Sequence, residues 1–195
     1  MKNRNIKQMA GVALLMAMVV VMQFISSAIP PIGGISISLV LIPIVIGAAV
    51  FGPKAGALLG ATFSVVTIIN CITGADPGGQ MVFQANPFVC ILLVMAKGVL
   101  AGLVSGIVYS LLKGWNAYIA MLCAAIICPV VNTGVFLLGM ALFFTDVLSA
   151  WANGSNIVAY VLSGIVLVNF LPELLINVVF SPFGQRIVHV AKHEN

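Results

Sequence analysis

The sequence predicts an all-α integral membrane protein with six transmembrane helices and both termini in the cytoplasm. Of its 195 residues, 62% are hydrophobic and only 6% are charged. The mean hydropathy is +1.23, and the apolar residues form long runs separated by short segments rich in turn residues. So few residues lie outside these runs that a separate soluble catalytic or ATP-binding domain does not fit. We therefore expect a single membrane domain over residues 1–195.

Each apolar run is expected to form one helix, and the approximate bounds are 9–29, 35–51, 55–72, 87–112, 117–144 and 156–180. The first run follows a basic segment, as in a signal peptide, but it is too long for a typical h-region, which favours a retained helix. The second run is short and contains Pro43, so we expect a kink or an incomplete crossing.

The basic residues favour one orientation of these six spans. With both termini on one side, seven of the eight lysines and arginines share that side, namely Lys2, Arg4, Lys7, Lys54, Lys113, Arg186 and Lys192. The opposite connections, 30–34, 73–86 and 145–155, contain no lysine or arginine. The positive-inside rule places the basic side in the cytoplasm and these connections outside. The basic residues are scattered, which argues against a nucleic-acid partner.

Two charged residues fall inside apolar runs. Lys97 lies ten residues after Pro87, which corresponds to about 15 Å of helix and places it near the membrane midplane. An ammonium group at that depth costs about 2.5–3.5 kcal/mol, so a partner or a polar cavity is expected. Glu173 is expected at a similar depth. The two can neutralise each other in a structural ion pair, which is the reading we favour for Glu173, or they can act as a proton relay. Lys97 can instead bind an anionic ligand, and for this residue both readings stay open.

Further candidates for a binding site are polar or aromatic residues near Lys97 or near the outer helix ends. Asn86 is expected on the same helix face as Lys97, Asn132 lies close to the kink expected at Pro129, and Asn169 precedes Glu173 by one turn. Aromatic residues at the outer ends can anchor the protein at the membrane interface or contact a ligand. The candidate substrate-binding residues are Lys97, Asn86, Asn132, Asn169, Trp151 and Phe88.

Small residues recur at helical spacing on two runs. They are Gly56, Gly60, Ser64 and Thr67 on the first and Gly98, Gly102 and Gly106 on the second. Such ridges allow close helix contact, and we expect them to pack within the chain.

No catalytic, phosphate-binding or metal-binding motif is present. The four cysteines lack the spacing of a zinc or redox site, so we interpret them as small apolar residues. His189 and His193 are too few to define a metal site. The sequence therefore predicts neither an enzyme nor a cofactor held by this chain.

The chain resembles the S components, the substrate-binding membrane subunits of energy-coupling factor (ECF) vitamin transporters. The resemblance rests on the six-helix pattern, on an AxxxA motif at Ala13 and Ala17, on the segments 51–70 and 86–113, and on the NFLPE sequence at 169–173. The segment 86–113 looks like the fourth helix of the riboflavin, folate and pantothenate type of S component. Cobalt and nickel members carry a histidine after the first methionine, whereas this chain has Lys2, so metal transport is not expected.

The resemblance implies a subunit of the bacterial plasma membrane that captures a vitamin from outside. Its partners would be a transmembrane coupling subunit, docking at Ala13 and Ala17, and two ATPase subunits that use ATP. Lys97 suits a carboxylate, so pantothenate is the first choice, riboflavin the second and folate the third. The alternative is a self-sufficient proton-coupled transporter or small channel that uses Lys97 and Glu173.

Overall fold

The protein is represented by a computed structural model, which describes residues 2–28, 40–154 and 156–193. Every regular element in these ranges is helical. In chain order the elements are α1 (Lys2–Ala28), α2 (Leu41–Phe51), α3 (Pro53–Thr73), α4 (Pro77–Ala85), α5 (Pro87–Leu112), α6 (Ala117–Phe143), α7 (Thr145–Ala152), α8 (Ile157–Tyr160), η1 (Val161–Phe170) and α9 (Leu171–His193).

The all-helical membrane class agrees with the prediction. Five helical segments are long and apolar enough to cross a membrane: one in α1, then α3, α5, α6 and the continuous segment from α8 to α9. The short helix α2 has 11 residues, about 16 Å, which is less than the hydrocarbon core of a bilayer. The connection 30–34 and residues 35–39 of the predicted second run lie outside the described residues. The described chain thus supplies five candidate spans and one short apolar helix.

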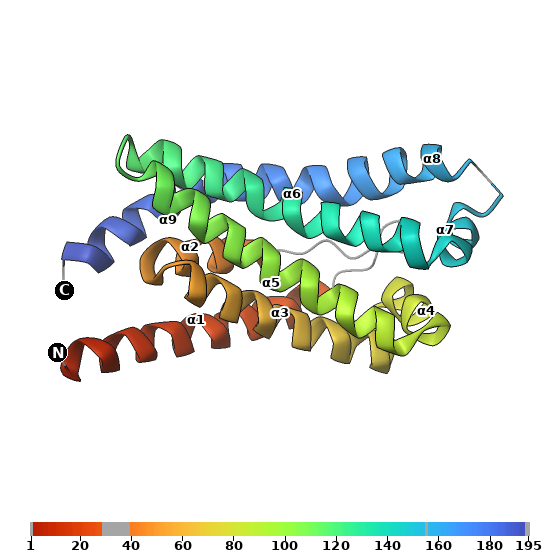
Figure 1. Cartoon of the computed structure of the whole chain (residues 1–195), viewed down its shortest axis with the longest axis horizontal. Coiled ribbons are helices and arrows are strands. Elements are labelled where there is room, and N and C mark those ends of the chain that lie inside the picture. The colour runs from red at the N-terminus through yellow and green to blue at the C-terminus, as the bar shows by residue number, and fades with distance from the viewer. Residues whose placement is uncertain (1, 29–39, 155, 194–195) are drawn as a thin grey trace.

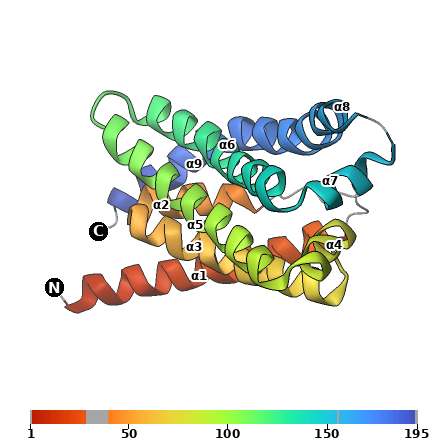
Figure 2. The same cartoon turned by 45° about the vertical axis from the view of Figure 1, so that its right-hand side comes forward.

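The two long polar connections contain helices that the sequence analysis did not predict. In the connection 73–86, α4 begins at Pro77, a favourable first helical residue because proline lacks the N–H that would remain unbonded there. In the connection 145–155, α7 carries Asp146 in its first turn, where a negative charge is favourable. Both helices lie at the end of the bundle opposite to the two chain termini (Figures 1 and 2).

The last helical segment is longer and less regular than predicted. It continues through Pro182 to His193 instead of ending near residue 180. Between α8 and α9 it forms a π-helix, η1, which ends at Phe170, two residues before Pro172. Proline has no N–H for the carbonyl of Val168 and its ring crowds that group, and the wider π turn relieves this conflict. Accordingly the N–H of Leu171 donates to the carbonyl of Val166, five residues earlier.

The helices α3 and α5 pack closely at the centre of the bundle through the two glycine ridges. A Cβ atom added at Gly60 would collide with the carbonyl oxygen of Gly98, and one added at Gly56 would collide with the carbonyl oxygen of Gly102. At Gly106 an added Cβ would lie 2.6 Å from the Cα atom of Pro53. The predicted packing of the two ridges within the chain is therefore confirmed.

This packing makes Gly60 sensitive to substitution. We expect Gly60→Ala to lower the free energy of unfolding by about 1–3 kcal/mol, because the obstacle is backbone and cannot rotate away. Gly134→Ala in α6 is the matched control, since nothing lies within 4 Å of an added Cβ there. Thermal or denaturant unfolding in detergent compares the two variants. Equal stability of both variants would contradict this account of the interface.

The buried apolar residues form two clusters along the bundle. The first includes Leu41, Leu59 and Met121 and lies toward the end that holds the termini. The second includes Val82, Met140 and Phe144 and lies toward α4 and α7. Members of both clusters, among them Phe63 and Val82, also line the polar cavity described next.

Candidate functional site

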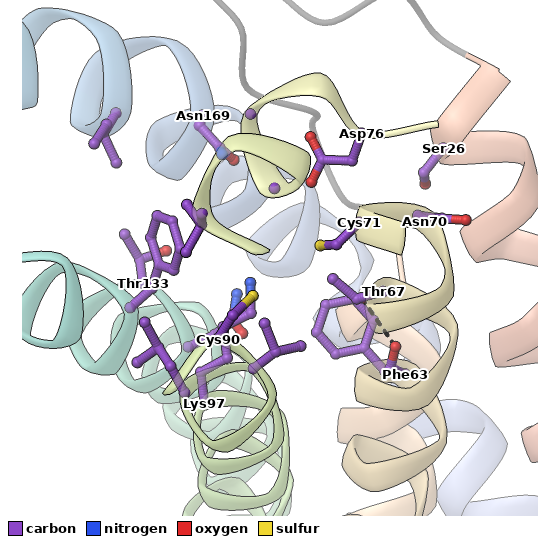
Figure 3. A pocket seen from close by; sticks show the side chains of 18 of the residues that line it. Ser26, Phe63, Thr67, Asn70, Cys71, Asp76, Cys90, Lys97, Thr133 and Asn169 are labelled. Atoms are coloured by element: carbon purple, nitrogen blue, oxygen red, sulfur yellow. Dashed lines mark hydrogen bonds between the residues drawn. The ribbon is translucent and has the colours of Figure 1, made fainter. Parts of the chain in front are cut away.

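A cavity lies in the half of the bundle that holds α4 and α7. The empty space between its walls, including open solvent at the mouth, is about 970 Å³. Its walls come from α1, α3, α4, α5, α6, α7, η1 and α9. Figure 3 shows polar side chains from several of these elements around the hollow, among them Lys97, Asp76 and Asn169.

Lys97 lines this cavity from the middle of α5. Its Nζ lies 4.8 Å from the ring centroid of Phe136 and 5.8 Å from that of Phe63. The faces of aromatic rings attract a cation, and this attraction strengthens where water is excluded. No ion pair of Lys97 is recorded among the described residues. Glu173 is 3% exposed and lines the same cavity, so its role as ion pair or relay stays a prediction.

Asn132 and Asn169, predicted as binding residues, also line the cavity. Asn132 is only 6% exposed. The buried Oδ1 atoms of both side chains accept no hydrogen bond within the described part of the chain. Because buried polar atoms in folded proteins nearly always have a partner, each oxygen is available to a ligand or to ordered water.

Trp151 forms the aromatic part of the wall together with Phe136. Their ring centroids are 6.5 Å apart and the planes are inclined by 25°, the stacked arrangement that aromatic pairs favour. Trp151 belongs to α7 and Phe136 to α6, so the stack connects the short helix to a long one. The rings offer a flat apolar surface next to the ammonium of Lys97.

Asn86 and Phe88 are not among the residues that line the cavity. The side chain of Asn86 turns back to cap α5, where its Oδ1 accepts a hydrogen bond of 3.2 Å from the N–H of Val89. Phe88 is 72% exposed. We expected Asn86 to share a helix face with Lys97, which requires Asn86 to be part of the helix. In the structure Asn86 is instead the N-cap residue of α5 and has an extended backbone.

Several polar lining residues were not proposed from the sequence. They are Gln23, Ser26, Thr67, Asn70, Asp76 and Thr133. The signal for two of them was present, because Thr67 and Asn70 continue the small and polar stripe of α3. Thr67 also connects two helices: its Oγ1 donates to the carbonyl of Phe63 at 2.9 Å and accepts from Nε2 of Gln23 at 3.5 Å.

The predicted docking residues Ala13 and Ala17 are not among the residues that line the cavity. Both are exposed, and α1 packs against α2 and α3 with its other side. The neighbouring Leu14 is 72% exposed and Met18 is 46% exposed. The described part of the chain leaves this small and apolar face uncovered.

One comparison with known proteins gave a match. A comparison with curated proteins found no match. The family model described as "ECF transporter, substrate-specific component" matches residues 7–183. This range includes all the residues that line the cavity, together with Ala13 and Ala17. The chain belongs to the family of substrate-specific components of ECF transporters.

Proposed function

We propose that this protein is the substrate-binding subunit of an ATP-driven ECF-type vitamin uptake transporter. It captures a water-soluble vitamin in the cavity between α4, α5, α6 and η1 and delivers it with a coupling module. Family membership supports the class of function, and the polar cavity in an otherwise apolar chain supports a binding role.

The observation that carries the proposal is the position of the Lys97 ammonium at the cavity wall, between two aromatic rings. A cation at such a depth gains most from an anionic group, because a charge-assisted hydrogen bond offsets its lost hydration. A carboxylate-bearing vitamin fits this requirement, with pantothenate first. Riboflavin is the second choice, since the stacked rings of Phe136 and Trp151 suit a flat heterocycle. Folate is the third.

The coupling module in this proposal consists of a transmembrane subunit and two ATPase subunits. The transmembrane subunit docks on the exposed face of α1 at Ala13 and Ala17, where small side chains permit close approach of another helix. We place the subunit in the bacterial plasma membrane with both termini in the cytoplasm. This orientation follows the distribution of basic residues.

One observation favours a second candidate, a proton-coupled transporter that works without ATPase partners. Three buried polar side chains follow Glu173 on α9 at four-residue spacing, namely Asn177, Ser181 and Gln185. This polar line runs from the cavity toward the end that holds the termini. Vitamin uptake into liposomes that contain this chain alone, driven by a proton gradient, would favour the second candidate; uptake only with ATP and the coupling module favours the first.

The proposal is tested by the thermal stability of the purified protein in a panel of vitamins. A ligand that binds only the folded protein stabilises it by RT ln(1 + [L]/Kd), about 2.7 kcal/mol at a concentration of 100 Kd. We expect one carboxylate-bearing vitamin, pantothenate before the others, to raise Tm clearly. A panel in which no vitamin changes Tm would contradict the proposal.

A further inference from the structure

Two of the four cysteines lie together in the cavity wall. Cys71 is 2% exposed and Cys90 is 1% exposed. Cys71 lies near the end of α3 and Cys90 near the start of α5. The two side chains are neighbours, and both line the cavity. Figure 3 shows the two sulfur atoms in the same hollow, approaching from different helices.

The segment between the two cysteines contains α4, which itself lines the cavity with Gly78, Gly79 and Val82. Gly79 lies directly against Cys71, since an added Cβ there would collide with the Cys71 sulfur atom. The N–H of Asp76 donates to the carbonyl of Asn70 at 3.3 Å, which holds the start of this segment against α3. A covalent bond between the thiols would therefore close a loop whose middle is α4.

We propose that Cys71 and Cys90 form a redox modification site, at which a disulfide bond fixes α4 over the binding cavity. The co-reactant is a low-molecular-mass disulfide. One cysteine thiolate attacks it and forms a mixed disulfide, releasing the first small thiol. The second thiolate then attacks the protein sulfur of the mixed disulfide, which forms the Cys71–Cys90 bond and releases the second small thiol. Two protein thiols and one disulfide thus give one protein disulfide and two small thiols.

The position of the pair favours this chemistry. Both sulfur atoms line a cavity with an open mouth, so a small polar disulfide has a route to them. In the orientation proposed above, this end of the bundle faces the outside of the cell, where disulfides persist. That statement about the compartment rests on the proposed function, whereas disulfide formation in purified protein depends on neither orientation nor ligand.

The first test counts thiols in the full-length protein. Purified protein is treated with oxidised glutathione, denatured and labelled with a maleimide of high mass. We expect the number of labelled thiols to fall from four to two, and peptide mass spectrometry to identify the Cys71–Cys90 bond. In Cys71→Ser and in Cys90→Ser no internal disulfide should form, and the matched control Cys123→Ser should still form it. Four labelled thiols in the treated wild type, or a bond that involves Cys123 or Cys128, would overturn the proposal.

The second test measures whether the bond restrains α4. Amide hydrogen exchange of residues 77–85 should slow by about fivefold or more after oxidation, because opening of α4 then requires bending of a closed loop. The control segment is α7, the other short helix at this end, whose exchange should stay unchanged. Addition of a reductant should restore fast exchange in α4. A disulfide that forms without slowing α4 would overturn the second half of the proposal.

Discussion

Replacement of Lys97 with methionine is expected to lower the affinity for the vitamin by about 30-fold or more. Removing one partner of a buried, hydrogen-bonded charge pair costs about 2–5 kcal/mol, which sets this lower limit. Methionine keeps a long apolar side chain between Phe63 and Phe136 and removes a charge from the membrane interior. The variant should therefore fold at least as stably as the wild type without ligand. Isothermal titration against the vitamin found in the panel measures the loss.

Two further variants separate charge recognition from other effects of the substitution. Lys97→Arg keeps the positive charge and should retain more affinity than Lys97→Met, although the shape of its head group differs. Lys113→Met removes an exposed lysine at the far end of α5 and should leave the affinity unchanged. If the affinity of Lys97→Met for the vitamin is within about threefold of the wild-type affinity, Lys97 does not recognise the charge of the ligand.

Replacement of Ala17 with tryptophan is expected to abolish assembly with the coupling subunit while ligand binding stays intact. The side chain of Ala17 is exposed on the face of α1 that the described chain leaves uncovered. An indole ring there keeps a partner helix from the close approach that small residues permit. Ala13→Trp should act in the same way. Copurification of the coupling subunit with each variant measures assembly.

Ala141→Trp supplies the matched control for this prediction. Ala141 is also an exposed alanine, but it lies on α6, away from α1. Its replacement should leave both assembly and ligand affinity unchanged. Assembly that survives Ala13→Trp and Ala17→Trp would remove the docking role from this face of α1.

The long helices could be predicted because each corresponds to an apolar run in the sequence that is long enough to cross a membrane. The bounds expected for the helix that carries Lys97, 87–112, coincide with α5 (Pro87–Leu112). The short helices α4 and α7 could not be predicted in this way, since each has fewer than ten residues and lies in a polar segment. Glycine residues at 78 and 79 also weaken the helical signal of α4.

Four of the six predicted binding residues, Lys97, Asn132, Asn169 and Trp151, line the cavity. Three of them could be predicted because a polar side chain inside an apolar helix is unusual and therefore informative. Lys97, Asn132 and Asn169 belong to this class. The choice of Asn86 depended on helical phase at the N-cap position, just before α5, where the backbone is extended and not helical.

The proximity of Cys71 and Cys90 could not be predicted from their spacing in the sequence. Cys71 and Cys90 are separated by a helix and two turns, so no local motif connects them. They meet because the glycine ridges hold α3 and α5 close together and α4 folds back between their ends. The interpretation of all four cysteines as small apolar residues is therefore incomplete for this pair, since both side chains line the cavity as neighbours.

The most direct test of the central claim is the identification of the small molecule held by the protein after purification from cells grown in rich medium. The account predicts about one carboxylate-bearing vitamin for each wild-type chain, released on denaturation and identified by mass spectrometry, and much less in Lys97→Met because the affinity is lower. A neutral or cationic ligand that Lys97→Met retains at the wild-type level would contradict the claim that the ammonium of Lys97 selects the substrate.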